Sequence, residues 1–428
     1  MASILPASLR EPLPPIPSVR ASLVFGALVA GLVLGLTLSF AAPGAVGPAL
    51  AFAGPVGELW LRALQATIIP LVAALLFTGI VQTVEAASAG RLARRSLGWF
   101  AAMLAGGAVM SALFTPLLLK IFPMPAAAAR ALREGLSGTD AGPVPGFADF
   151  LRSIVPDNVI GAAASGAVLP LILFVTVFAL AAMRLPERQR EALALFFRAV
   201  AGAMLVVIGW VLAAAPVGVF ALSLTVAVTS GTAAIGALAH YVAVVAGVGT
   251  VVFLAAYVVA VTGARRALVP FARAMLPAQA IALSTQSSLA TLPAMLGVCR
   301  AIGVRETTAD FTLPLAVALF RSTGPAMNLA VAIYVAHWFG MELTAPMLIA
   351  GFAVATLTTL GAVSLPGALS FVTSIGPIAL AMGVPVGPLA LLVAVEVLPD
   401  LMRTLGNVTM DVAVTAAVDR AEGNRETN

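Results

Sequence analysis

The chain has 428 residues, of which 61% are hydrophobic and 10% are charged, and its mean hydropathy is +1.08. This composition excludes a soluble domain, and the length of the chain is far more than one span needs. The sequence therefore predicts a multi-spanning membrane protein. The net charge is +5, but the sequence contains no basic run dense enough to follow a nucleic-acid backbone. This argues against a nucleic-acid partner. The single cysteine, Cys299, excludes an internal disulfide framework and a multi-cysteine metal site.

Six apolar segments follow one another before residue 263. The first continues to about Ala42 for roughly 20 residues, which is typical of a retained span and not of a cleaved signal. The second ends near Thr83, and Pro70 inside it is expected to kink the helix. The fifth is longer than a span requires, so we expect it to be tilted or broken near Pro216. The third to sixth segments cover 97–122, 159–183, 194–228 and 235–262.

Arginine clusters follow the second, fourth and sixth segments and recur near both ends of the chain. By the positive-inside rule, the loops that carry them and both termini are expected in the cytoplasm. The sequence therefore predicts a multi-pass protein of the cytoplasmic (inner) membrane, surrounded by membrane lipid.

Beyond residue 266 the apolar segments are interrupted by serine, threonine, glycine and proline. Two interruptions, at 278–293 and 358–367, leave too little apolar length on either side for two ordinary spans. They predict helical hairpins that enter the membrane and turn back, and such paired breaks in two repeats indicate a transporter binding site. The expected fold is all-α, with eight transmembrane helices and two re-entrant hairpins arranged as inverted repeats. The last elements are hairpin 1 (263–298), span 7 (309–340), hairpin 2 (345–382) and span 8 (386–418).

Polar residues form a stripe in the last apolar segment. Glu396, Asp400, Arg403, Asn407 and Asp411 are spaced by 4, 3, 4 and 4 residues, which places them on one face of an α-helix. Ionisable groups are costly inside a bilayer, so this stripe predicts a substrate or ion site.

Four segments resemble the glutamate transporter family, also described as dicarboxylate/amino acid:cation symporters. The likeness in order and spacing runs from about residue 270 to 415. The segments are Ser287-Ser288-Leu-Ala-Thr291-Leu-Pro293, Phe311-Thr-Leu-Pro-Leu315, Gly361-Ala-Val-Ser364-Leu-Pro366-Gly367 and Asp400-Leu-Met-Arg403-Thr404-Leu-Gly-Asn407-Val-Thr-Met-Asp411.

The resemblance implies a homotrimer in which each protomer moves a transport domain across the membrane as an elevator, against a fixed scaffold. The scaffold would comprise spans 1 and 2 (1–96) and, after an extracellular loop, spans 4 and 5 (123–232). The transport domain would comprise span 3 (97–122) and 233–428.

The resemblance also implies roles for individual residues in binding an acidic amino acid. Arg403 would hold the side-chain carboxylate of the substrate, Asp400 its ammonium group, and Thr404 and Asn407 would complete the polar shell. A guanidinium binds a carboxylate through two parallel hydrogen bonds, which fits the first role. Backbone contacts would come from the tips of the two hairpins: Ser287, Ser288, Gly361, Ser364, Pro366 and Gly367.

The chain departs from the family where span 7 would carry Asn-Met-Asp-Gly-Thr for sodium. Here the sequence is Phe320-Arg321-Ser322-Thr323-Gly324. Sodium needs several hard oxygens, and Asp411 and Asn407 alone are too few. We therefore hypothesise that sodium coupling is weakened or lost, with Arg321 as a tethered surrogate cation near Asp411, and with Ser322 and Thr323 beside it. No other cofactor is implied.

Several alternatives remain open at the level of sequence. Arg321 could instead reach water or pair with Glu396, leaving sodium bound elsewhere. Protons carried by Glu396 or Asp411 could drive transport, and uncoupled diffusion is equally permitted. The substrate could be a C4-dicarboxylate or a neutral amino acid. An enzyme is disfavoured, because no catalytic motif is present, and a pure channel fits the paired broken segments less well.

Overall fold

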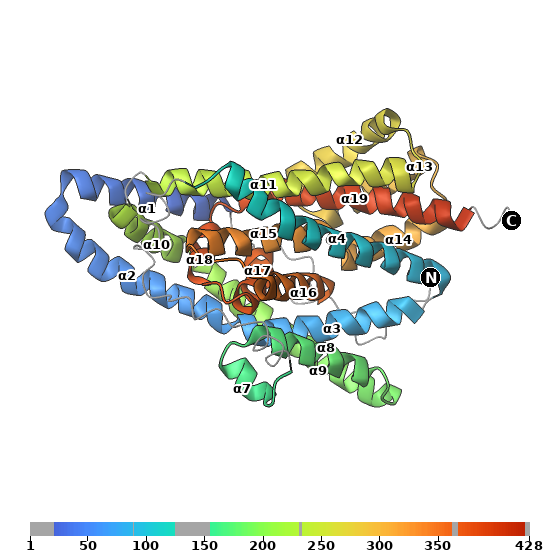
Figure 1. Ribbon diagram of the computed structural model, residues 1–428, viewed down its shortest axis with the longest axis horizontal. Coiled ribbons are helices and arrows are strands. Elements are labelled where there is room, and N and C mark those ends of the chain that lie inside the picture. The colour runs from blue at the N-terminus through green and yellow to red at the C-terminus, as the bar shows by residue number, and fades with distance from the viewer. Residues whose placement is uncertain (1–20, 89, 125–154, 231–232, 362–366, 424–428) are drawn as a thin grey trace.

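The computed structural model describes residues 21–88, 90–124, 155–230, 233–361 and 367–423. This part of the chain is helical and contains no strand, so the predicted all-α class is confirmed (Figure 1). Within it, six helical stretches, two of them interrupted, are long and apolar enough to cross a membrane. They are Leu23–Ala41, Pro43–Ser88, Arg91–Ile121, Glu187–Ala213, Ile235–Gly263 and Glu306–Trp338.

The first helices lie at one end of the molecule and along one side. Helix α1 (Ala21–Ala41) is followed by α2 (Pro43–Ala66) and α3 (Ile68–Ser88). The helix is interrupted at Thr67 because Pro70 has no N–H to donate to the carbonyl four residues earlier, at Ala66. This is the kink that the sequence predicts.

A second proline divides the expected fifth span into two helices. Helix α9 (Glu187–Ala213) ends two residues before α10 (Ala215–Ser230), and Pro216 lies in the first turn of α10. The two helices have different partners, since α9 packs on α3 and α10 packs along α1. The approach of α10 to α1 is so close that a Cβ atom at Gly31 would collide with Ser223.

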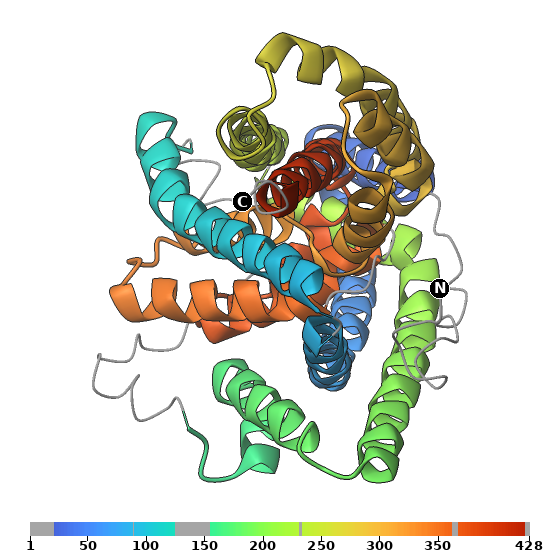
Figure 2. The same ribbon diagram turned by 90° about the vertical axis from the view of Figure 1, so that its right-hand side faces the viewer.

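Two shorter helices precede α9 in the chain: α7 (Val159–Ala164) and α8 (Val168–Ala182). Aromatic rings join α8, α9 and α3, and Phe77 stacks on Phe197 with a centroid distance of 4.1 Å. Figures 1 and 2 both show α8 and α9 on the opposite side of the molecule from α12 and α13.

The C-terminal half consists of paired and broken helices, several of which pack on α19. Helices α12 (Leu268–Thr285) and α13 (Ser288–Ala301) pack together and are joined through Gln286, whose φ is 49°. Helices α16 (Ala345–Gly361) and α17 (Gly367–Ala381) form a second pair. Both predicted interruptions therefore lie at helix ends. Helices α14 (Glu306–Leu319) and α15 (Thr323–Trp338) form a broken run, and α18 (Gly387–Leu392) leads into α19 (Val397–Gly423).

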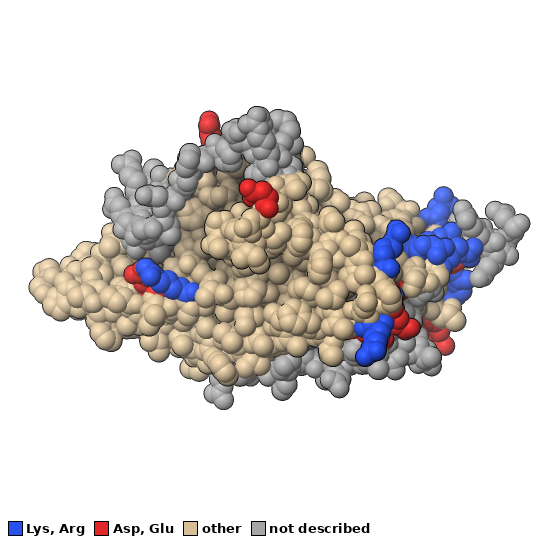
Figure 3. Space-filling view, turned by 90° about the horizontal axis from the view of Figure 1, so that it is seen from below, with Lys and Arg blue, Asp and Glu red and all other residues tan. Residues whose placement is uncertain are grey.

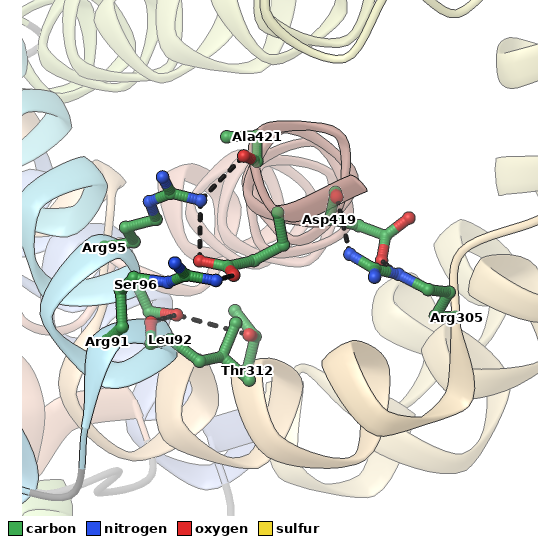
Figure 4. Close-up of polar contacts among 9 residues, drawn as sticks. Arg91, Leu92, Arg95, Ser96, Arg305, Thr312, Asp419 and Ala421 are labelled. Atoms are coloured by element: carbon green, nitrogen blue, oxygen red, sulfur yellow. Dashed lines mark hydrogen bonds and ion pairs between the residues drawn. The ribbon is translucent and has the colours of Figure 1, made fainter. Parts of the chain in front are cut away.

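Helix α4 (Arg91–Ile121) lies beside α19 and α15 and is fixed at both ends. At its start, Arg91 and Arg95 form ion pairs with Glu422 at 2.8 and 2.6 Å (Figure 4). At its end, the carbonyl of Phe122 accepts a 2.8 Å hydrogen bond from Nε2 of His240. His240 belongs to α11 (Ala233–Val258), which continues into the π-helical turn η2 (Val259–Gly263).

The end of α19 is held by cations from other elements as well. Arg305, before α14, lies 2.8 Å from Asp419, and Arg420 donates to the carbonyl of Gly263 at 2.9 Å. Cations suit this position because the C-terminus of a helix carries partial negative charge. Figure 3 shows most of the Lys and Arg on the visible face gathered at one end, some basic and acidic groups near the other end, and little charge between them, as expected for a protein that spans a membrane.

Candidate functional site

The polar stripe of the sequence lies in the interior, mostly on α19. Asp400, Arg403, Thr404, Asn407 and Asp411 are all buried, as is Glu396 just before the helix begins. Elements packed around this part of α19 include α4, α11 and α15. The structure thus brings the expected charged residues together away from the surface.

The guanidinium of Arg403 is enclosed by acceptors from the protein itself. Its Nη2 lies 2.7 Å from Oε1 of Glu396, and its Nη1 donates to Oδ1 of Asn328 at 2.7 Å. Its Nε lies 3.3 Å from Oδ1 of Asp400. Tyr241 from α11 holds the other oxygen of Glu396, donating to Oε2 at 2.9 Å. Glu396 is therefore the partner of Arg403, in place of the alternative pairing with Arg321.

Asn407 connects α19 to the break between α14 and α15. Its Oδ1 accepts hydrogen bonds from the backbone N–H and the hydroxyl of Thr323, both at 2.9 Å, and from the hydroxyl of Ser322 at 3.2 Å. Because α15 begins at Thr323, the side chain of Asn407 satisfies a backbone donor that the helix leaves unpaired. Ser322 and Thr323 thus lie beside Asn407.

Asp411 is 1% exposed, and within the described residues neither of its carboxylate oxygens has a hydrogen-bond partner. A buried carboxylate is costly unless a positive charge compensates it. Arg321, in the break before α15, lies close enough for its charge to interact with those of Asp411, Asp400 and Arg403. The ring of Phe320 stacks on Phe100 of α4 at 4.5 Å and so covers the break. Arg321 and Asp411 thus lie within range of each other's charge, and within the described residues no direct hydrogen bond joins them.

A small cavity opens between these groups, with room for about one water molecule. Both guanidinium groups, Arg321 and Arg403, line it. The full lining is Arg321, Thr323, Gly324, Asn328, Thr359, Ser374, Arg403 and Asn407. An anion entering this cavity would meet two cations, three hydroxyl groups and two amides.

Some residues named from the sequence are not among this lining. Ser287 caps α13, where it accepts from the N–H of Ala290 at 3.2 Å, and Ser288 begins that helix. The hydroxyl of Thr404 donates to the carbonyl of Asp400 at 3.0 Å. Gly361 ends α16 and Gly367 begins α17, whereas Ser364 and Pro366 lie outside the described residues.

Four residues near the site were not foreseen: Tyr241, Asn328, Thr359 and Ser374. Asn328 carried a usable signal, because it is an amide in an otherwise apolar stretch and lies two helical turns after Arg321. The other three are hydroxyl residues of kinds that also occur at packing positions. Sequence alone did not distinguish them.

Among the described residues, part of the oxygen donor set that a sodium site would need at this position is already used. Oδ1 of Asn407 already accepts three hydrogen bonds, and the neighbouring Arg321 supplies a positive charge. Asp411 retains two oxygens, but a cation of this type needs several more. No cluster of three or more His, Cys, Asp or Glu residues that could hold a metal occurs in the described ranges.

Residues 21–421 match the sodium:dicarboxylate symporter family. The chain belongs to this family. The resemblance seen in the sequence is thereby confirmed, and the family consists of transporters and not of enzymes. Together with the long apolar helices, membership indicates a multi-pass protein of the inner membrane.

Relatives of this symporter-family chain differ in what their names say they carry. The proton/glutamate-aspartate symporter of Escherichia coli (strain K12) is 25% identical, over 92% of this chain and 91% of its own length. The neutral amino acid transporter B(0) of Oryctolagus cuniculus is 29% identical, over 79% and 69%. The C4-dicarboxylate transport protein 2 of Bradyrhizobium diazoefficiens is 26% identical, over 76% and 72%.

Proposed function

We propose that this symporter-family member is a secondary active transporter of acidic amino acids, L-aspartate or L-glutamate, with weak or absent coupling to sodium. It would work as a homotrimer with eight spans and two re-entrant hairpins, both termini being cytoplasmic. The name of the proton/glutamate-aspartate symporter supports this substrate class. Arg403 and Asp400 support it chemically, since one suits a carboxylate and the other an ammonium group.

An elevator mechanism is supported by how the helices are bonded to one another. Described ion pairs and side-chain hydrogen bonds join α4, α12 and Arg305, just before α14, to α19, whereas others join α2 or α3 to α9. Between these two groups, α16 and α17 pack on α3, and the contact that the structure describes there is apolar, with Ile68 against Gly376. An interface of this kind has few directional bonds to break when one group slides along the other.

The observation that carries the sodium part of the proposal is the burial of Asp411, without a hydrogen-bond partner among the described residues, within range of the charge of Arg321. In this arrangement the guanidinium supplies a permanent positive charge where a bound ion would otherwise be required. Sodium binding would then add a second cation next to the first, which is electrostatically unfavourable. Transport would then be driven by protons, or it would be uncoupled diffusion of the substrate.

The test is binding of L-aspartate to the purified full-length chain, with and without sodium, in the parent and in Arg321→Met. The parent is expected to bind equally well in both conditions. Arg321→Met is expected to bind poorly without sodium, because Asp411 loses its only proposed counter-charge. Uptake by the parent that requires a steep sodium gradient would overturn the proposal. Competition by glutamate, malate and serine tests the substrate class directly. Preference for malate would indicate a C4-dicarboxylate as the substrate, and preference for serine a neutral amino acid.

A further inference from the structure

Two guanidinium groups line the small cavity beside α19, and no carboxylate does so among the described lining residues. Arg403 belongs to α19, and Arg321 lies in the break before α15. The cavity has room for about one water molecule. Both cations therefore lie next to the same small space, and a single ligand group that enters it would meet both.

Arg403 retains N–H groups for a ligand although protein acceptors surround it. A guanidinium has five N–H groups and no acceptor. Its Nη2, Nη1 and Nε contact Glu396, Asn328 and Asp400 respectively. These three contacts leave one N–H on each Nη atom. Arg403 can thus form two further hydrogen bonds and keep all three of its protein partners.

The two amides of the lining also retain donors, because their oxygens are already used. Oδ1 of Asn328 accepts from Arg403 at 2.7 Å, and Oδ1 of Asn407 accepts from the backbone N–H of Thr323 at 2.9 Å. Guanidinium and backbone N–H groups only donate, so the partners fix the orientation of both amides. Each amide therefore directs its oxygen to the protein and keeps its NH2 group for other acceptors.

The two threonine hydroxyls of the lining already donate within the protein. The hydroxyl of Thr359 donates to the carbonyl of Ala355 at 2.7 Å, and that of Thr323 donates to Oδ1 of Asn407 at 2.9 Å. Their oxygens and that of Ser374 are the remaining side-chain acceptors of the described lining. The lining is thus rich in N–H donors, which suits a ligand group that only accepts, such as a carboxylate.

We propose that Arg321 is a second substrate-binding arginine, which holds the side-chain carboxylate of the substrate together with Arg403. This inference rests on the proposed transport of acidic amino acids. Asp411 does not engage Arg321 through hydrogen bonds, since neither carboxylate oxygen has a described partner. Arg321 therefore acts on Asp411 through its charge and on the substrate through its N–H groups.

This arrangement distinguishes L-aspartate from L-asparagine, which has nearly the same size and shape. The carboxylate of L-aspartate accepts charge-assisted hydrogen bonds, which are roughly twice as strong as neutral ones. The carboxamide of L-asparagine has only one acceptor oxygen, and its NH2 group would face other donors. Arg321 thereby becomes a specificity-determining residue as well as a counter-charge.

The test measures equilibrium binding of radiolabelled L-aspartate and L-asparagine to purified full-length chains, at one pH and ionic strength. The ratio of the two affinities is compared between the parent and its variants. Arg321→Met is expected to lower the preference for L-aspartate by about tenfold or more. Arg321→Lys keeps the charge but not the planar fork, so a smaller fall is expected. Arg62→Met is the matched control, because Arg62 is 73% exposed on α2, and its ratio should equal that of the parent.

The double variant Arg321→Met/Asp411→Asn separates the two roles of Arg321. It removes the carboxylate that Arg321 is proposed to compensate, so an effect that acts only through Asp411 should disappear. The preference for L-aspartate is expected to stay as low as in Arg321→Met. A return to the ratio of the parent would overturn the inference, as would an unchanged ratio in Arg321→Met itself. If Arg321→Met does not fold, the double variant and Arg321→Lys decide in the same way.

Failure of the proposed substrate gives a different result. If the parent binds succinate but neither amino acid, the same comparison is made with succinate and its monoamide. A fall of that ratio in the Arg321 variants would show that the amino-acid assignment is wrong and that Arg321 binds a carboxylate. A parent that binds L-asparagine as tightly as L-aspartate, or binds none of these compounds, would overturn both proposals.

Discussion

Asn407 accepts two hydrogen bonds from Thr323, one from its backbone N–H and one from its hydroxyl, each at 2.9 Å. The middle of α19 thus caps the start of α15, although the two residues lie 84 positions apart in the chain. This bond fixes where the broken helix resumes and hence where Arg321 and the cavity lie.

Asn407→Ala should therefore destabilise the protein and disturb the site. The N–H of Thr323 would be left buried without a partner, which costs about 1–3 kcal/mol. A lower thermal unfolding midpoint and weaker substrate binding are expected. Asn407→Asp retains an acceptor oxygen at the same place and serves as the control, with a smaller loss of stability. Equal losses for both variants would contradict the capping role.

Arg321 and Asp411 should be energetically coupled. Either Arg321→Met or Asp411→Asn alone removes one of the two opposite charges that we propose compensate each other, and breaking a buried pair of this kind costs about 3–5 kcal/mol. The double variant removes both and should recover part of that loss. Unfolding of the two single variants and the double variant, compared as a double-mutant cycle, measures the coupling. Strictly additive losses would show that the two charges do not interact.

Glu422 should contribute more to stability than an ordinary surface ion pair. Its side chain is 11% exposed and forms ion pairs with both Arg91 and Arg95. Glu422→Gln is expected to lower the unfolding free energy by about 1–2 kcal/mol, because Arg95 would lose a charged acceptor. Glu58→Gln is the matched control, since the Glu58–Arg62 pair is 59% and 73% exposed. Its loss should be below about 0.5 kcal/mol.

Gly376 lies where α17 meets α3, between the two helix groups. A Cβ atom there would lie 2.9 Å from Cδ1 of Ile68. Gly376→Leu should obstruct sliding, so net uptake into proteoliposomes should fall by an order of magnitude or more while L-aspartate binding is retained. Ile68→Ala in the same chain makes room and should restore part of the uptake. Loss of binding together with uptake would instead indicate local unfolding.

The sequence alone predicts the helical class, the breaks and the charged stripe because each depends on local chemistry. Pro70 and Pro216 each remove a backbone donor at their own position, which favours a break there. The spacing from Glu396 to Asp411 places those residues on one helix face. It does not predict which partners the charges choose. The approach of Asn328 and Tyr241 from other helices depends on packing between segments distant in the chain.

Helix α4 is fixed at its first turn by Glu422 and just beyond its last residue by His240. Its 31 residues span about 46 Å. One inserted residue would turn one fixed end by about 100° relative to the other. The exposed face of α4 should therefore accept many substitutions, whereas the helix should accept no change in length, because its length sets the distance between the two attachment points.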